Sequence, residues 1–90
     1  MTTAEVTVRI RYLSALRDTT HIRMEEVRFP ASTRLRDISG WLERKYSITA
    51  PGPAVMGTLN GRGWTQIPQS LETELQNGDE IALFPLLSGG

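Results

Sequence analysis

The last two residues, Gly89 and Gly90, carry the group in this sequence with the clearest chemistry, a terminal carboxylate on a narrow segment. Glycine has no Cβ, so a Gly-Gly end fits a channel too narrow for other residues and can present its carboxylate to a reagent inside. A carboxylate is a poor electrophile because its charge is delocalised. The sequence has no Gly-rich phosphate-binding loop that would activate it. We therefore expect a separate enzyme to activate Gly90.

The chemistry expected at Gly90 is adenylation followed by thiolation. An ATP-using partner would convert the carboxylate to an acyl-adenylate, and a sulfur donor would displace AMP to leave a thiocarboxylate. Gly90 would then be a substrate and a sulfur donor, and the chain would contain no catalytic residue of its own. We expect Gly89, Ser88, Leu87 and Leu86 to form the segment that inserts into a partner, with the two leucines as anchors.

The composition restricts the classes of function. Ninety residues suit one small domain, and 39% hydrophobic with 22% charged residues is ordinary for a globular protein. Ten basic and ten acidic residues cancel, which argues against a nucleic-acid or membrane-surface partner. With no cysteine and a single histidine, His21, metal binding is not expected, and no bound cofactor is predicted. There is no apolar stretch near ~20 residues and no signal-peptide pattern, so a cytoplasmic location is expected.

The first half of the chain reads as two strands and a helix. Apolar residues alternate over 6–12, which predicts a strand, and 13–18 suggests a turn or a short helical stretch. In the next segment the apolar residues fall in two phases, Ile22 and Met24 in one and Val27 and Phe29 in the other. A single regular strand cannot bury all four, so we predict a bulge near Glu25 and Glu26.

A helix is expected after Pro30, capped by Ser32 or Thr33. Its apolar stripe consists of Leu35, Ile38, Leu42 and Tyr46. Gly40 interrupts it at a cost of roughly 1 kcal/mol against alanine, which suggests a close approach to a strand. Trp41 and Trp64 are expected to complete the core.

The second half predicts a hairpin and a central strand. Asn60-Gly61 is a two-residue hairpin signal, with a return arm through Trp64 and Ile67 to Pro68. Leu71 and Leu75 are expected to anchor a loop or a short helix. Residues 77–79 are expected to form a turn. The run 80–84 is apolar on both faces, which is typical of a central, buried strand. This order predicts an α+β protein of the β-grasp class, a mixed sheet of four to five strands covered by one main helix, with residues 1–85 as the domain and 86–90 as a flexible tail.

Two segments resemble a known family. LQNGDEIALFPLLSGG, residues 75–90, is similar to the ending of molybdopterin synthase small subunits and related ubiquitin-like sulfur carriers of the MoaD/ThiS type, and RYLSALRD, residues 11–18, is similar to the end of their first strand. The resemblance implies a β-grasp fold and a thiocarboxylate on Gly90. It also implies two partners: a ubiquitin-activating-like adenylating enzyme (MoeB/ThiF-type) that uses ATP, and the large molybdopterin synthase subunit as sulfur acceptor.

Several alternatives stay open on the sequence alone. The sulfur acceptor could instead belong to tRNA thiolation, or to cysteine or thiamin synthesis. The chain could also be a ubiquitin-like modifier joined to targets through Gly90, or a β-grasp binding module with an inert tail. Four residues are candidates for a partner surface, although exposed arginines are often only solvated: Arg9, Arg11, Arg17 and Phe84.

Overall fold

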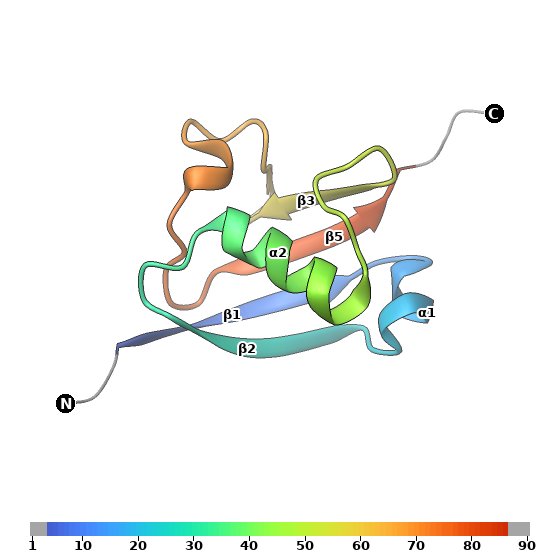
Figure 1. Ribbon diagram of the computed structural model, residues 1–90, viewed down its shortest axis with the longest axis horizontal. Helices are drawn as coiled ribbons and strands as arrows, with labels where there is room; N and C mark the ends of the chain where they lie inside the picture. The colour runs from blue at the N-terminus through green and yellow to red at the C-terminus, as the bar shows by residue number, and fades with distance from the viewer. Residues whose placement is uncertain (1–3, 87–90) are drawn as a thin grey trace.

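One mixed β-sheet, crossed on one face by a single long helix, makes up most of the computed structural model, which describes residues 4–86 (Figure 1). The elements are β1 (Glu5–Tyr12), α1 (Leu16–Thr20), β2 (Met24–Pro30), α2 (Leu35–Tyr46), β3 (Val55–Leu59), β4 (Arg62–Gly63), the 3-10 helix η1 (Ser70–Glu72) and β5 (Glu80–Pro85). The strand order is β2-β1-β5-β3-β4. Among the strand pairs of residues 4–86, β1–β5 is the only parallel one. The predicted β-grasp fold is confirmed.

The β1–β2 ladder is regular, so the predicted bulge is wrong. Pairing runs without an extra residue from Glu5 opposite Pro30 to Arg11 opposite Met24. Glu25 shares the inward face of β2 with Val27 and Phe29, and a carboxylate therefore occupies a place expected for an apolar residue. Met24, in the other phase, is 44% exposed. The prediction failed because it required every apolar residue of this segment to be buried.

The N-terminus of α2 is capped differently from the prediction. The helix begins at Leu35, and the carboxylate of Asp37 accepts a hydrogen bond from the Arg34 backbone N–H at 2.9 Å. Thr33 uses its hydroxyl elsewhere, donating to the Pro30 carbonyl at 2.6 Å, and Ser32 has a left-handed φ of 80°. Both predicted caps therefore belong to the turn that precedes the helix.

The apolar stripe of α2 packs on the sheet as predicted. Leu35, Ile38 and Leu42 are fully buried, and Tyr46 packs against the edge of the same core. The prediction that Gly40 lets a strand approach the helix is wrong. A Cβ at Gly40 would lie 3.1 Å from Nη1 of Arg44, so its space is filled by a side chain of the same helix.

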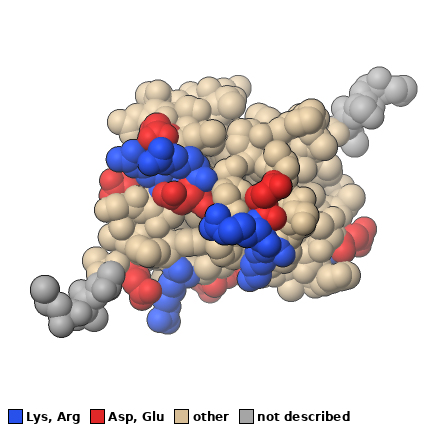
Figure 2. Space-filling model, in the orientation of Figure 1, with Lys and Arg blue, Asp and Glu red and all other residues tan. Residues whose placement is uncertain are grey.

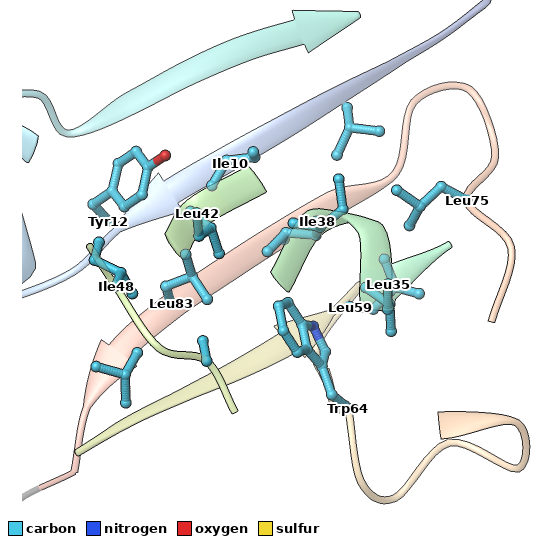
Figure 3. Packing of buried hydrophobic residues seen from close by; sticks show 14 of the residues in the cluster. Ile10, Tyr12, Leu35, Ile38, Leu42, Ile48, Leu59, Trp64, Leu75 and Leu83 are labelled. Atoms are coloured by element: carbon cyan, nitrogen blue, oxygen red, sulfur yellow. The ribbon is translucent and has the colours of Figure 1, made fainter. Parts of the chain in front are cut away.

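The predicted hairpin forms at Asn60-Gly61, where both residues have positive φ, 51° and 87°. Its return arm is shorter than expected, because β4 ends at Gly63. The chain then turns inward and buries Trp64 completely (Figure 3). Trp64 lies against Gly57 of β3, where a Cβ would stand only 2.6 Å from Cε2 of the indole. Because Gly57 has no side chain, the indole of Trp64 can pack directly against β3.

Strand β5 is central, as predicted, between β1 and β3. Its inward residues Ile81 and Leu83 are fully buried, and Leu83 lies under α2 beside Leu42 (Figure 3). Ala82 and Phe84 point to the opposite face and are only half-buried. Burial on both faces was therefore predicted wrongly, since α2 covers only one of them. The division into a domain of residues 1–85 and a tail of residues 86–90 stays a prediction.

Candidate functional site

The candidate site begins where β5 ends, because the Gly-Gly terminus follows this strand. Pro85 pairs with Val55 of β3, and the backbone N–H of Leu86 donates to the Ala54 carbonyl at 2.8 Å. On the other side, the N–H of Leu13 donates to the Leu83 carbonyl at 3.0 Å. Backbone hydrogen bonds therefore hold the chain on the β1 side as far as Leu83 and on the β3 side as far as Leu86. Gly90, Gly89, Ser88 and Leu87 lie outside the described residues, and their roles stay predictions.

Apolar side chains surround this point on the sheet face opposite α2. Phe84 lies opposite Met56 in the β3–β5 ladder, and by strand alternation Leu86 follows Phe84 on the same face. Leu13, next to β5 at the end of β1, is 39% exposed, and Leu86 is 43% exposed. We call these four residues, Leu13, Met56, Phe84 and Leu86, the root patch. An exposed apolar cluster of this kind is typical of a contact surface.

Two of the predicted arginines lie on the same face as the root patch. Arg9 is paired in the ladder with Glu80, and Arg11 with Ala82, two residues before Phe84. Nη1 of Arg11 lies 3.2 Å from the Glu80 carboxylate, and Arg9 lies 4.0 Å from both Glu80 and Glu26. The structure thus brings Arg9, Arg11 and Phe84 together, with the arginines held beside carboxylates.

Arg17 belongs to another element than Arg9, Arg11 and Phe84. It lies on α1, where its Nε donates to the Ser14 carbonyl at 3.3 Å. The shallow pocket that it lines is formed by Arg17, Asp18, His21, Ile22 and Arg23. This pocket includes none of Arg9, Arg11 and Phe84, and a common surface for the four predicted residues stays a prediction.

The helix-bearing face of the molecule carries interspersed charges of both signs (Figure 2). Arg34 at the start of α2 lies 2.9 Å from the Glu72 carboxylate, and Arg36 lies 3.6 Å from it. Within residues 4–86, no three His, Asp or Glu side chains are placed to hold a metal ion. Among the same residues, no helix has the length and apolar character required to cross a membrane.

A partly buried polar cluster that the sequence reasoning missed lies at the same end of the sheet. Oε2 of Glu25 accepts hydrogen bonds from the hydroxyls of Tyr12, at 2.6 Å, and Tyr46, at 2.7 Å. Nζ of Lys45 lies 3.5 Å from the other carboxylate oxygen. We call Tyr12, Glu25, Lys45 and Tyr46 the Glu25 cluster. The available signal was the phase of Glu25, which matches that of Val27 and Phe29.

The electrostatics of the Glu25 cluster favour neutral tyrosines. Burial, followed by the hydrogen bond to Glu25 and its negative charge, raises the pKa of Tyr12 far above its ordinary value. The same causes raise the pKa of Tyr46 to about 12. Both hydroxyls therefore stay protonated donors near neutral pH, and the cluster ties together β1, β2 and α2.

A mixed five-stranded sheet crossed by one helix, with the chain end following the central strand, defines a ubiquitin-like β-grasp protein. The model of the ThiS family matches residues 10–90, which is most of the sequence. The chain therefore belongs to the ThiS family of ubiquitin-like sulfur carriers. No curated protein sequence matches it significantly.

Solved structures with low sequence identity share the fold. The HVO 2177 protein of Haloferax volcanii has a TM-score of 0.79 at 22% identity, covering 96% of this chain and 88% of its own. Small archaeal modifier protein 1 of Methanosarcina acetivorans has a TM-score of 0.71 at 21% identity, covering 97% and 99%. In the Helicobacter pylori complex of subunits 1 and 2 of molybdopterin-converting factor, the matching chain has a TM-score of 0.61 at 24% identity, covering 94% and 100%.

Proposed function

We propose that this protein is a non-catalytic sulfur carrier for molybdopterin or tungstopterin synthesis in the cytoplasm. A ubiquitin-activating-like enzyme uses ATP to adenylate the Gly90 carboxylate, and a sulfur donor converts the adenylate to a thiocarboxylate. A synthase then takes the sulfur. The observation that carries the proposal is the root of the tail: the Gly-Gly sequence follows a central strand that hydrogen bonds fix up to Leu86, beside an exposed apolar patch.

The position of the root limits where a partner can bind. Five residues, 86–90, span at most ~17 Å when fully extended. The active site that receives Gly90 must therefore lie within that distance of Pro85, and its enzyme must cover the surface around the root. The root patch is that surface. When the root patch is in contact with the partner, the tail is already confined near the active site. It therefore loses less conformational freedom when it inserts.

The chemistry around the root suits a protein partner. The root patch is apolar, and Arg9, Arg11 and Glu80 on the same sheet face supply charged groups beside it. An apolar centre with a polar rim is the usual anatomy of a protein interface. We assign Phe84 to the centre of this interface, because it is flanked by Met56 on β3 and precedes Leu86 on its own strand.

The proposed acceptor of sulfur is the large subunit of a molybdopterin synthase. The similar chain from Helicobacter pylori was solved in complex with subunit 2 of molybdopterin-converting factor, which supports a partner of this kind for the present chain. The pterin route also agrees with the RYLSALRD segment. The other acceptors, in tRNA thiolation or in cysteine or thiamin synthesis, would use the same activated Gly90.

The decisive test is the intact mass of the protein after incubation with its activating enzyme, ATP and a sulfur source. Exchange of one terminal oxygen for sulfur supports the proposal, and a chain lacking Gly89 and Gly90 is the matched control. An unchanged mass with a partner shown to be active on another carrier contradicts it. Incubating the thiocarboxylated protein with candidate acceptors then identifies the route.

Protein modification is the second candidate function. The similarity to small archaeal modifier protein 1 favours it, since that protein carries the word modifier in its name. A modifier would appear in cell extract as conjugates linked through Gly90 to lysines of other proteins. Thiocarboxylate without conjugates supports the carrier role alone.

A further inference from the structure

Lys45 is the only lysine of this chain, and its side chain is held in place by three neighbours. It lies on the last turn of α2, with Nζ 3.5 Å from Oε1 of Glu25. The same nitrogen lies 4.9 Å from the ring centroid of Trp41 and 5.4 Å from that of Tyr46. The side chain is 48% exposed, so solvent reaches it while the ammonium keeps these contacts.

The groups that hold Lys45 are themselves fixed. Glu25 is anchored by the two tyrosine hydroxyls on its other oxygen, and its side chain is only 17% exposed. Trp41 packs edge-on against Phe29 at 5.6 Å and against Tyr46 at 6.0 Å. The site for the ammonium is therefore preformed by β2 and α2, and Lys45 loses its contacts whenever it turns outward.

We propose that this site keeps the only lysine from capturing acyl groups, so that the carrier does not consume its own activated terminus. Acylation requires Nζ to lose a proton and to form a bond to the Gly90 carbonyl carbon of a second molecule, while AMP leaves with the bonding electrons. Nζ must first leave both Glu25 and the aromatic rings. The chain also has no cysteine that could react in its place. The biological role of this protection depends on the proposed function, whereas the low reactivity of Lys45 does not.

The test uses an ordinary acylating reagent on the full chain and needs no partner enzyme. Arg44→Lys places a second lysine beside Lys45, at an exposed position for which the described residues show no ion pair. The protein is treated with N-hydroxysulfosuccinimide acetate, and peptide fragmentation gives the acetylation rate at each position. Position 44 is expected to react about fivefold faster than Lys45, from the combined strength of a surface ion pair and a cation–π contact. A ratio below about threefold overturns the proposal.

Removing the Glu25 contact should release the lysine. In Glu25→Gln combined with Arg44→Lys, the ratio of the two rates is expected to fall toward one, because the amide can still accept from a tyrosine but no longer attracts the ammonium. Circular dichroism verifies folding. If that variant does not fold, Trp41→Leu combined with Arg44→Lys provides the same comparison by removing one ring. The ratio of acetylation rates at positions 44 and 45 in Arg44→Lys alone still decides the proposal. A slow Lys45 together with a Gly90 that is never thiolated would contradict the carrier function while leaving this inference intact.

Discussion

The hydroxyl of Tyr12 lies 2.6 Å from Oε2 of Glu25 and donates a hydrogen bond to it. This bond joins the end of β1 to the start of β2 at the end of the sheet from which the tail leaves. Tyr12 is fully buried, so its hydroxyl depends on Glu25 for this hydrogen bond. The side chain of Glu25 is therefore mostly buried at the edge of the core, although it belongs to a residue type that is usually exposed.

Truncation of Glu25 is expected to destabilise the protein. Glu25→Ala leaves the buried Tyr12 hydroxyl without its partner, which costs about 1–3 kcal/mol of the free energy of unfolding. Urea denaturation monitored by circular dichroism measures the change. The matched control is Glu26→Ala, since Glu26 is exposed and makes only a 4.0 Å contact with Arg9. Its effect should stay below about 0.5 kcal/mol, and equal losses in both variants would contradict a buried role for Glu25.

The two tyrosines of the Glu25 cluster predict a loss of stability at alkaline pH. Their pKa values are raised in the folded state, to about 12 for Tyr46 against an ordinary value of 10.0. Above pH 10 the unfolded chain releases these protons first, so the free energy of unfolding falls. The stabilisation is complete below pH 10 and is lost as the pH rises through the folded-state pKa. Urea denaturation at a series of pH values between 8 and 12 should show this decline.

A matched variant assigns the alkaline decline to the cluster. Tyr46→Phe removes one titrating hydroxyl and should reduce the slope of stability against pH above 10. Tyrosinate absorbance gives the same information directly, because the Tyr46 proton is released near pH 12 only while the protein is folded. An unchanged slope in Tyr46→Phe would show that the decline arises elsewhere.

Gly57 is predicted to be a position where one methyl group is not tolerated. A Cβ there would lie 2.6 Å from Cε2 of the buried Trp64, and overpacking of this kind costs typically about 1–3 kcal/mol. The control is Gly63→Ala in the neighbouring strand β4, where the nearest atom is the flexible Gln66 side chain at 3.2 Å. Thermal unfolding compares the two. If the indole is the obstacle, Trp64→Leu should lower the additional cost of Gly57→Ala.

Local sequence patterns predicted the elements of this fold that depend on neighbours in the chain. The stripe of α2 and the Asn60-Gly61 hairpin follow from periodicity and turn chemistry within a few residues. The hydrogen-bond partners of Glu25 cannot be predicted in this way, because Tyr12 and Tyr46 are separated from it by 13 and 21 residues. Periodicity indicates which face of a strand a residue occupies. It does not indicate which distant hydroxyl will compensate a buried charge.

The candidate site was likewise predicted where adjacent residues define it and missed where distant strands form it. The Gly-Gly end and its root after the apolar strand were predicted from adjacent residues, and the structure confirms that this strand is central. Arg17 lies on α1 and lines a pocket that includes neither Arg9 nor Arg11, so its grouping with them stays a prediction. The root patch was missed apart from Phe84 and Leu86, since Leu13 and Met56 join it only through the pairing of β1 and β3 with β5.

The root patch predicts a defect in partner binding that leaves the chemistry of Gly90 intact. Phe84→Ser removes a half-buried aromatic ring from the proposed interface, and the loss of a central contact costs at least about 2 kcal/mol of binding free energy, roughly thirtyfold in affinity. With the activating enzyme, KM for this protein should rise accordingly while kcat stays within about twofold, since the reacting carboxylate is unchanged. Ile67→Ser is the control, because Ile67 is also partly buried but its carbonyl accepts from the Ser70 N–H of η1, which lies away from the end of β5 (Figure 1). A KM that rises equally in both variants would point to a general loss of folding, and an unchanged KM for Phe84→Ser would remove the root patch from the interface.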